Sequence, residues 1–128
     1  MSRDIDELFM RQAVALARKG YGRTSPNPMV GALLVKRGKV IGEGWHKRAG
    51  APHAEIEAIR AAANSRGATL YVTLEPCSTV GRTPSCVEAV KAAGIRRVVV
   101  AATDPNPAHA GRAFRQLRSA GNMVSRGV

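Results

Sequence analysis

One imidazole, two thiols and one carboxylate stand at spacings that could build a catalytic zinc site. His53 and Glu55 lie two positions apart, and Cys77 and Cys86 follow later in the chain. Catalytic zinc is commonly held by three side chains, and water takes the fourth tetrahedral position. The metal makes that water acidic, and a neighbouring carboxylate can move its protons. The residue types therefore predict a zinc-dependent hydrolase.

The short spacing between His53 and Glu55 predicts where the site lies. On a regular helix, residues two apart point about 200° away from each other. Both side chains can face one metal only if His53 lies at the entrance of a helix, where the backbone is not yet helical. Pro52 favours such an entrance, because proline is common at the start of helices. We therefore expect a helix from about His53 to Ala63 with the site at its amino end.

Each of these residues also has a simpler explanation. Two cysteines could form a disulfide or be inert buried thiols, and a single histidine is often an ordinary polar residue. Their joint appearance with Glu55, with Pro52 and Pro76 each preceding a ligand candidate, favours a metal site. A histidine, a glutamate two residues later and paired cysteines are the signature of zinc deaminases, so the expected reaction is hydrolytic loss of an exocyclic amine.

The cysteine spacing points to a particular kind of deaminase. Eight residues separate Cys77 from Cys86, instead of the two in that signature. The segment 67–86 resembles the deaminase domain of the riboflavin biosynthesis proteins, the diaminohydroxyphosphoribosylaminopyrimidine deaminases of the cytidine and deoxycytidylate deaminase-like superfamily. Three further segments resemble the same domain: 25–32, 42–46 and 104–112. The resemblance implies that His53, Cys77 and Cys86 bind Zn²⁺ and that Glu55 shuttles protons.

The resemblance also implies a substrate and residues that hold it. The family deaminates the riboflavin-pathway intermediate 2,5-diamino-6-ribosylamino-4(3H)-pyrimidinone 5′-phosphate with zinc-activated water. By position in the matching segments, Asn27 contacts the pyrimidine and Arg82 the phosphate, while His46, Asp104 and Asn106 line the ribose and phosphate end. An amide both donates and accepts hydrogen bonds at a heterocycle edge, and a guanidinium fork suits a phosphate. Asn27 could instead be a turn residue and Arg82 a solvated charge.

Three positions depart from the family's pattern. Thr79 replaces a histidine near the substrate, Ser85 replaces a proline before the second cysteine, and Val80 is apolar where a polar or aromatic residue is common. None of them is a zinc ligand or the proton carrier. The departures therefore concern recognition of the phosphoribosyl end of the substrate.

The strong positive charge predicts an anionic partner. The chain has 20 Lys and Arg against 9 Asp and Glu, a formal net charge of +11, and Arg112, Arg115 and Arg118 recur at every third position. A phosphorylated aminopyrimidine explains part of this charge. A deaminase acting on cytosine or adenine in nucleic acid, or on a free base or nucleoside, is the alternative enzyme, although 4% aromatic residues leave few side chains to stack on bases.

A third alternative belongs to another class of protein. The chain could be an inactive, zinc-stabilised binding subunit that supports another deaminase. Inactive relatives of enzymes tend to lose the general base, so the presence of Glu55 argues against this interpretation.

Length and composition predict one domain over residues 1–128, without a reductase domain. The charged first residues do not resemble a signal peptide, and no apolar run is long enough to span a membrane. With two cysteines, a reducing cytoplasm is the expected location. A homo-oligomer or a reductase partner on another chain would be compatible with the resemblance.

The elements that must position these residues form an expected α/β three-layer sandwich. Asp4 and Glu7 predict a helix cap, and an apolar stripe continues that first helix to Gly20: Ile5, Leu8, Phe9, Ala13, Leu16 and Ala17. Strands are expected at 30–35, 40–45, 69–74, 97–102 and 123–125, and further helices at 86–93 and 112–120. The first two strands make a hairpin around Arg37 and Gly38. The resemblance implies a cytidine-deaminase-like, mostly parallel sheet, with the metal at the carboxyl end of the third strand.

Overall fold

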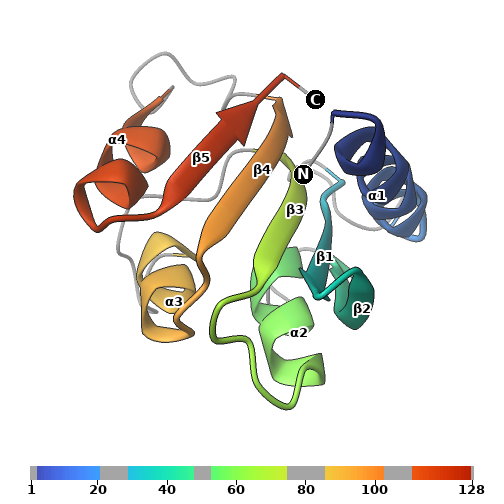
Figure 1. Cartoon of the computed structure of the whole chain (residues 1–128). Helices are drawn as coiled ribbons and strands as arrows, with labels where there is room; N and C mark the ends of the chain where they lie inside the picture. The colour runs from blue at the N-terminus through green and yellow to red at the C-terminus, as the bar shows by residue number, and fades with distance from the viewer. Residues whose placement is uncertain (1–2, 21–28, 48–52, 75–85, 103–110, 128) are drawn as a thin grey trace.

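A five-stranded sheet with helices on both faces forms the fold (Figure 1). The computed structural model describes residues 3–20, 29–47, 53–74, 86–102 and 111–127. The strands are β1 (Gly31–Lys36), β2 (Lys39–Trp45), β3 (Thr69–Leu74), β4 (Arg97–Ala102) and β5 (Met123–Arg126). The helices are α1 (Arg3–Arg18), α2 (Ala54–Ala61), α3 (Cys86–Ala92) and α4 (Arg112–Ser119). The expected α/β three-layer architecture is confirmed.

The sheet is mixed, in the order β2-β1-β3-β4-β5. β1 is antiparallel to both β2 and β3, whereas the pairs β3–β4 and β4–β5 are parallel. The parallel part expected from alternating strands and helices is thus confined to the last three strands. The opening hairpin explains the difference, because it reverses the chain between β1 and β2, and the crossover through α2 then places β3 beside β1 rather than beside β2.

Two residues turn the chain between β1 and β2, as expected. Arg37 and Gly38 both have positive φ, 53° and 76°, and Lys36 pairs with Lys39 across the turn. Positive φ at both central residues matches the right-handed twist of a hairpin. The turn also pairs Val35 with Val40. A register shift between Leu34 and Val35 then places Trp45, the last residue of β2, opposite Gly31.

Alternating strand residues divide the core into two layers. One face of the sheet packs against α2, α3 and α4, and the other against α1 (Figure 1). The first layer holds, among others, Leu34, Leu70, Val98, Val87 and Phe114. The second holds Met10, Ala13, Leu16, Leu33, Val35, Tyr71 and Val99. Since α2 and α3 share one face and contact each other, residues at their amino ends can meet.

The structure corrects the expected apolar stripe of the first helix. Ile5 and Leu8 are 42% and 58% exposed, whereas Asp6 is only 3% exposed. Asp4, expected as the cap, lies inside α1, which begins at Arg3. The inward position of Asp6 is compensated by ion pairing, because Arg97 donates from Nη2 to Asp6 Oδ2 over 2.7 Å and from Nη1 to Oδ1 over 3.0 Å.

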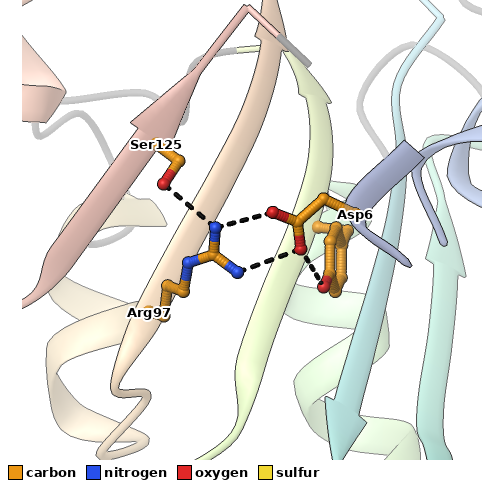
Figure 2. Close-up of polar contacts among 4 residues, drawn as sticks. Asp6, Arg97 and Ser125 are labelled. Carbon is orange, nitrogen blue, oxygen red and sulfur yellow. Dashed lines mark hydrogen bonds and ion pairs between the residues drawn. The ribbon is translucent and has the colours of Figure 1, made fainter. Parts of the chain in front are cut away.

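This ion pair links α1 to two strands. Figure 2 shows the Arg97 guanidinium between the Asp6 carboxylate and Ser125 of β5, and Arg97 Nη2 donates to Ser125 Oγ over 3.1 Å. The Tyr71 hydroxyl of β3 donates to Asp6 Oδ1 over 2.7 Å. The network thereby ties the first helix to β3, β4 and the last strand. Among the described residues, no helix is both long and apolar enough to cross a membrane.

Candidate metal and active site

The start of α2 brings a histidine and a carboxyl group to one end of the helix. His53 is the N-cap residue, with φ −70° and ψ 161°, and its carbonyl accepts a hydrogen bond from Glu57 N over 3.1 Å. The helix begins only at Ala54, so His53 has the extended backbone that the sequence analysis required. Glu55, two residues on, is 3% exposed. The expected end of the helix was two residues too late, because Ala62 is already extended, with ψ 137°.

The start of α3 supplies a thiol to the same place. Cys86 is the first residue of this helix and is 2% exposed. Its Sγ lies 3.2 Å from Nδ1 of His53, although the two residues are 33 positions apart in the chain. Two of the three expected zinc ligands are therefore brought together by the contact between α2 and α3.

The donor set fits a zinc ion as far as it is described. A nitrogen and a sulfur bound to one tetrahedral zinc, at about 2.0 Å and about 2.3 Å from the metal, lie about 3.5 Å apart. The observed separation of 3.2 Å is within a few tenths of an ångström of that value. The described residues contain no group of three or more potential ligands, but Cys77, the expected third ligand, lies outside them.

His46 is the other expected site residue that the structure describes. It follows the last residue of β2, it is 3% exposed, and its backbone N–H donates to Val30 O over 3.0 Å. Its ring stands edge-on to the ring of His53, with centroids 5.5 Å apart and an interplanar angle of 88°. The structure thus brings His46 to the candidate metal ligands. The other four expected substrate residues lie outside the described part of the chain: Asn27, Arg82, Asp104 and Asn106.

Two lysines stack on Trp45, whose side chain packs against the core layer under α1. The ammonium groups of Lys19 and Lys47 lie 4.7 Å and 5.1 Å from the ring centroid of Trp45, and Lys47 also pairs with Glu57 over 3.2 Å. Trp45 is the only tryptophan and directly precedes His46. Lys19 reaches this ring through the packing of α1 on the sheet, which no local pattern indicates. These cation–π contacts tie the end of α1 and the residue after His46 to Trp45.

A side-chain hydrogen bond also holds the strand ends next to the site. Thr73 Oγ1 of β3 accepts from Gly31 N of β1 over 3.1 Å, beyond the last backbone pair of these strands, Ala32 with Val72. The contact extends the β1–β3 pairing to Gly31, the residue after Val30, whose carbonyl accepts the hydrogen bond from His46 N. Threonine is common in strands, so the presence of Thr73 in β3 did not indicate this hydrogen bond.

Comparisons with known proteins identify relatives of nearly the full chain. Residues 3–102 match the family model described as the cytidine and deoxycytidylate deaminase zinc-binding region. The riboflavin biosynthesis protein RibD of Aquifex aeolicus is 53% identical over 129 residues, covering 100% of this chain and 36% of that protein. The chain therefore spans about a third of the length of the curated relatives that it matches.

Solved structures agree with the fold. A diaminohydroxyphosphoribosylaminopyrimidine deaminase/5-amino-6-(5-phosphoribosylamino)uracil reductase from Thermotoga maritima is 46% identical, with a TM-score of 0.93, covering 98% of this chain and 37% of that one. A structure from studies of A-to-I editing by tRNA:A34 deaminases is 32% identical, with a TM-score of 0.72, covering 94% of this chain and 98% of that one.

Proposed function

The chain belongs to the cytidine and deoxycytidylate deaminase zinc-binding family, and we propose that it deaminates 2,5-diamino-6-ribosylamino-4(3H)-pyrimidinone 5′-phosphate. The similarity to the RibD protein and to the Thermotoga deaminase/reductase supports this substrate. The observation that carries the chemistry is the 3.2 Å approach of His53 Nδ1 to Cys86 Sγ, with the buried Glu55 on the helix turn that follows His53. The reductase activity in the Thermotoga name is not part of the proposal.

The proposed metal ligands are His53, Cys77 and Cys86. Zinc held by these residues would supply a Lewis acid that makes a water molecule acidic enough to attack at neutral pH. Two thiolates offset the charge of the ion, so the site needs a proton acceptor of its own. Glu55 is the carboxylate nearest to His53 in the sequence, and it lies on the first turn of α2.

Glu55 would move the protons of the reaction. Its carboxylate takes a proton from the attacking water while the water oxygen bonds to the ring carbon that carries the amine. Glu55 passes this proton to the ring nitrogen. It then takes the proton of the new hydroxyl group and gives it to the amine, so that the carbonyl forms, the carbon–nitrogen bond breaks and ammonia leaves. The 3% exposure of Glu55 limits competition from bulk water for these transfers.

His46 would orient the substrate. The buried imidazole of His46, edge-on to His53, offers a hydrogen-bonding nitrogen beside the ring being attacked. The formal net charge of +11 favours a phosphorylated molecule. We propose that Asn27, Arg82, Asp104 and Asn106 complete the contacts to the pyrimidine, ribose and phosphate.

Ammonia release from a substrate panel tests the proposal. The panel contains the pathway intermediate, its dephosphorylated form, cytosine, cytidine, deoxycytidylate and a short RNA with an unpaired adenosine. We expect turnover of the intermediate, with a lower kcat/KM for its dephosphorylated form. Release of ammonia from another member of the panel, with none from the intermediate, would contradict the proposed substrate.

Nucleic-acid deamination is the second candidate. Its support is the full-length similarity to the tRNA:A34 deaminase structure, at 32% identity against 46% for the Thermotoga protein. Basic residues on the exposed face of α4 would also attract RNA: Arg112, Arg115 and Arg118. Charge alone causes salt-dependent RNA binding, so product formation, and not retention of RNA, distinguishes this candidate from the first.

We propose that this chemistry takes place in a single deaminase domain in the cytoplasm. That domain would be able to form a homo-oligomer or to act with a separate reductase. One sheet with a core layer on each face supports the single domain. The oligomeric state is measurable by light scattering of the purified chain.

A further inference from the structure

Two glycines of β2 lie directly under the backbone of α2. A Cβ atom added at Gly44 would overlap the carbonyl oxygen of Ala54 and would come within 2.6 Å of Ala58 N and 2.7 Å of the Glu57 Cβ. A Cβ atom added at Gly42 would overlap the carbonyl oxygen of Ala58, one turn further along the helix. The strand and the helix therefore touch through backbone atoms at both positions.

Space, and not backbone conformation, requires glycine here. Positive φ values occur at other described glycines, such as Gly38, but not at Gly42 or Gly44. Both residues have ordinary strand backbone that alanine can adopt. Any side chain at Gly44 must instead lift α2 from the sheet, because the atoms it would meet are mostly backbone and cannot rotate away.

The contact at Gly44 lies at the turn that carries the candidate catalytic residues. Ala54, whose carbonyl rests on Gly44, stands between His53 and Glu55 in the chain. Cys86 belongs to α3, and the three atoms nearest to a Cβ at Gly44 all belong to α2. Lifting the first turn of α2 would therefore move His53 and Glu55 without moving Cys86 by the same amount.

We propose that Gly44 is a positioning residue for the metal site. Its lack of a side chain sets the depth at which the first turn of α2 lies on the sheet. That depth allows the 3.2 Å approach of His53 Nδ1 to Cys86 Sγ and fixes the height of Glu55 on the same turn. The inference rests on the proposed zinc-dependent function, and Gly42 provides a matched comparison on the same strand and helix.

Zinc affinity of Gly44→Ala and Gly42→Ala tests the proposal. Both substitutions overpack the same interface, so both metal-free proteins should lose stability, measured by urea unfolding followed through Trp45 fluorescence. Zinc is then titrated in competition with a chromophoric chelator. We expect the zinc Kd of Gly44→Ala to rise by about 10-fold to 100-fold, as for residues that orient metal ligands. The Kd of Gly42→Ala should equal that of the wild-type protein within error.

Turnover provides a second readout that lost stability alone would not move. In fully zinc-loaded protein, a displacement of Glu55 by about 1 Å should lower kcat by about 100-fold. KM should change less than kcat, because the three atoms nearest to a Cβ at Gly44 all belong to α2, which holds no expected substrate residue. Gly42→Ala should retain the wild-type kcat.

The outcomes separate this inference from the proposed function. Wild-type affinity for zinc in Gly44→Ala, or an equal loss in both variants, would overturn the role of Gly44 alone. A wild-type protein that binds no zinc would overturn the proposed function and the inference with it. If Gly44→Ala does not fold, Ala54→Val lifts the same turn from the core side, since Ala54 is fully buried. Unchanged zinc affinity in that folded variant would also overturn the inference.

Discussion

His53 and Glu55 can serve one reaction because they have different backbone conformations. The extended N-cap backbone of His53 ends where the helical backbone of Ala54 begins. This break relaxes the angle of about 200° that a regular helix imposes on residues two apart. Cys86, at the start of the neighbouring helix, completes the described part of the site.

Substitution of Glu55 by Gln separates metal binding from proton transfer. Glutamine keeps the size of the side chain and lacks the basic carboxylate, so zinc should remain at one equivalent per chain by elemental analysis. The kcat for ammonia release should fall by at least about 100-fold, the lower range for a general base. Glu57→Gln is the matched control on the same helix, because Glu57 pairs with Lys47 instead. Comparable losses of kcat in both variants would argue against Glu55 as the proton carrier.

Secondary-structure elements position these residues through close contacts between backbones. β2 approaches α2 at two glycines, and its register comes from the two-residue turn at Arg37 and Gly38 together with the register shift that follows in the β1–β2 pairing. Because β2 ends next to His46, an error in the hairpin would shift both the strand under α2 and a candidate substrate residue.

Gly38→Ala tests the hairpin. A side chain at Gly38 meets nothing within 4 Å, so the cost comes only from its φ of 76°. We expect the free energy of unfolding to fall by about 1 kcal/mol, the cost of a left-handed conformation for an L residue. Urea denaturation monitored by Trp45 fluorescence measures the change. Lys39→Ala, at the next position and with an exposed side chain, should be nearly neutral, and an equal loss there would show that the turn conformation is not the cause.

The stability of the whole molecule depends on the buried network of Asp6, Arg97 and Tyr71. Burial alone would raise the pKa of Asp6, but hydrogen bonds from Arg97 and Tyr71 outweigh it, and the pKa lies below the usual 3.8. Burial and the bond to Asp6 raise the pKa of the Tyr71 hydroxyl above its usual 10.0. The network therefore stabilises the fold at pH values above the pKa of Asp6 and below the pKa of Tyr71.

The pH dependence of Asp6→Asn checks this interpretation. At neutral pH the variant should be less stable than the wild-type protein by about 3 kcal/mol, because Arg97 loses its buried partner. A lowered native pKa gives stability that is present above pH 3.8 and lost as the pH falls through the native pKa. The difference between the two proteins should thus shrink in acid. A difference that stays constant from pH 7 to about pH 2 would contradict a charged Asp6 in the folded state.

Patterns along the chain predicted the elements well, but not the contacts between distant ones. Continuous apolar runs located β3 and β4 at their observed bounds, and turn residues located the hairpin. Periodicity placed Ile5 and Leu8 in the core, whereas Asp6 lies there, because its partner Arg97 is 91 residues away. Such pairing has no local signal.

The candidate site was predictable where the chemistry is local. His53 lies at the helix entrance that its spacing from Glu55 predicts, and Cys86 and the ring of His46 approach it. The roles of these residues and of Glu55 remain proposals. The sequence does not show that a side chain at Gly44 would clash, since the atoms that it would meet belong to α2.

Zinc K-edge X-ray absorption of the purified protein tests the central claim most directly. We expect one equivalent of zinc with two sulfur neighbours at about 2.3 Å and nitrogen or oxygen neighbours at about 2.0 Å. Cys86→Ser should remove one of the sulfur neighbours. Absence of zinc, or zinc surrounded only by nitrogen and oxygen, would contradict a metal held by His53, Cys77 and Cys86.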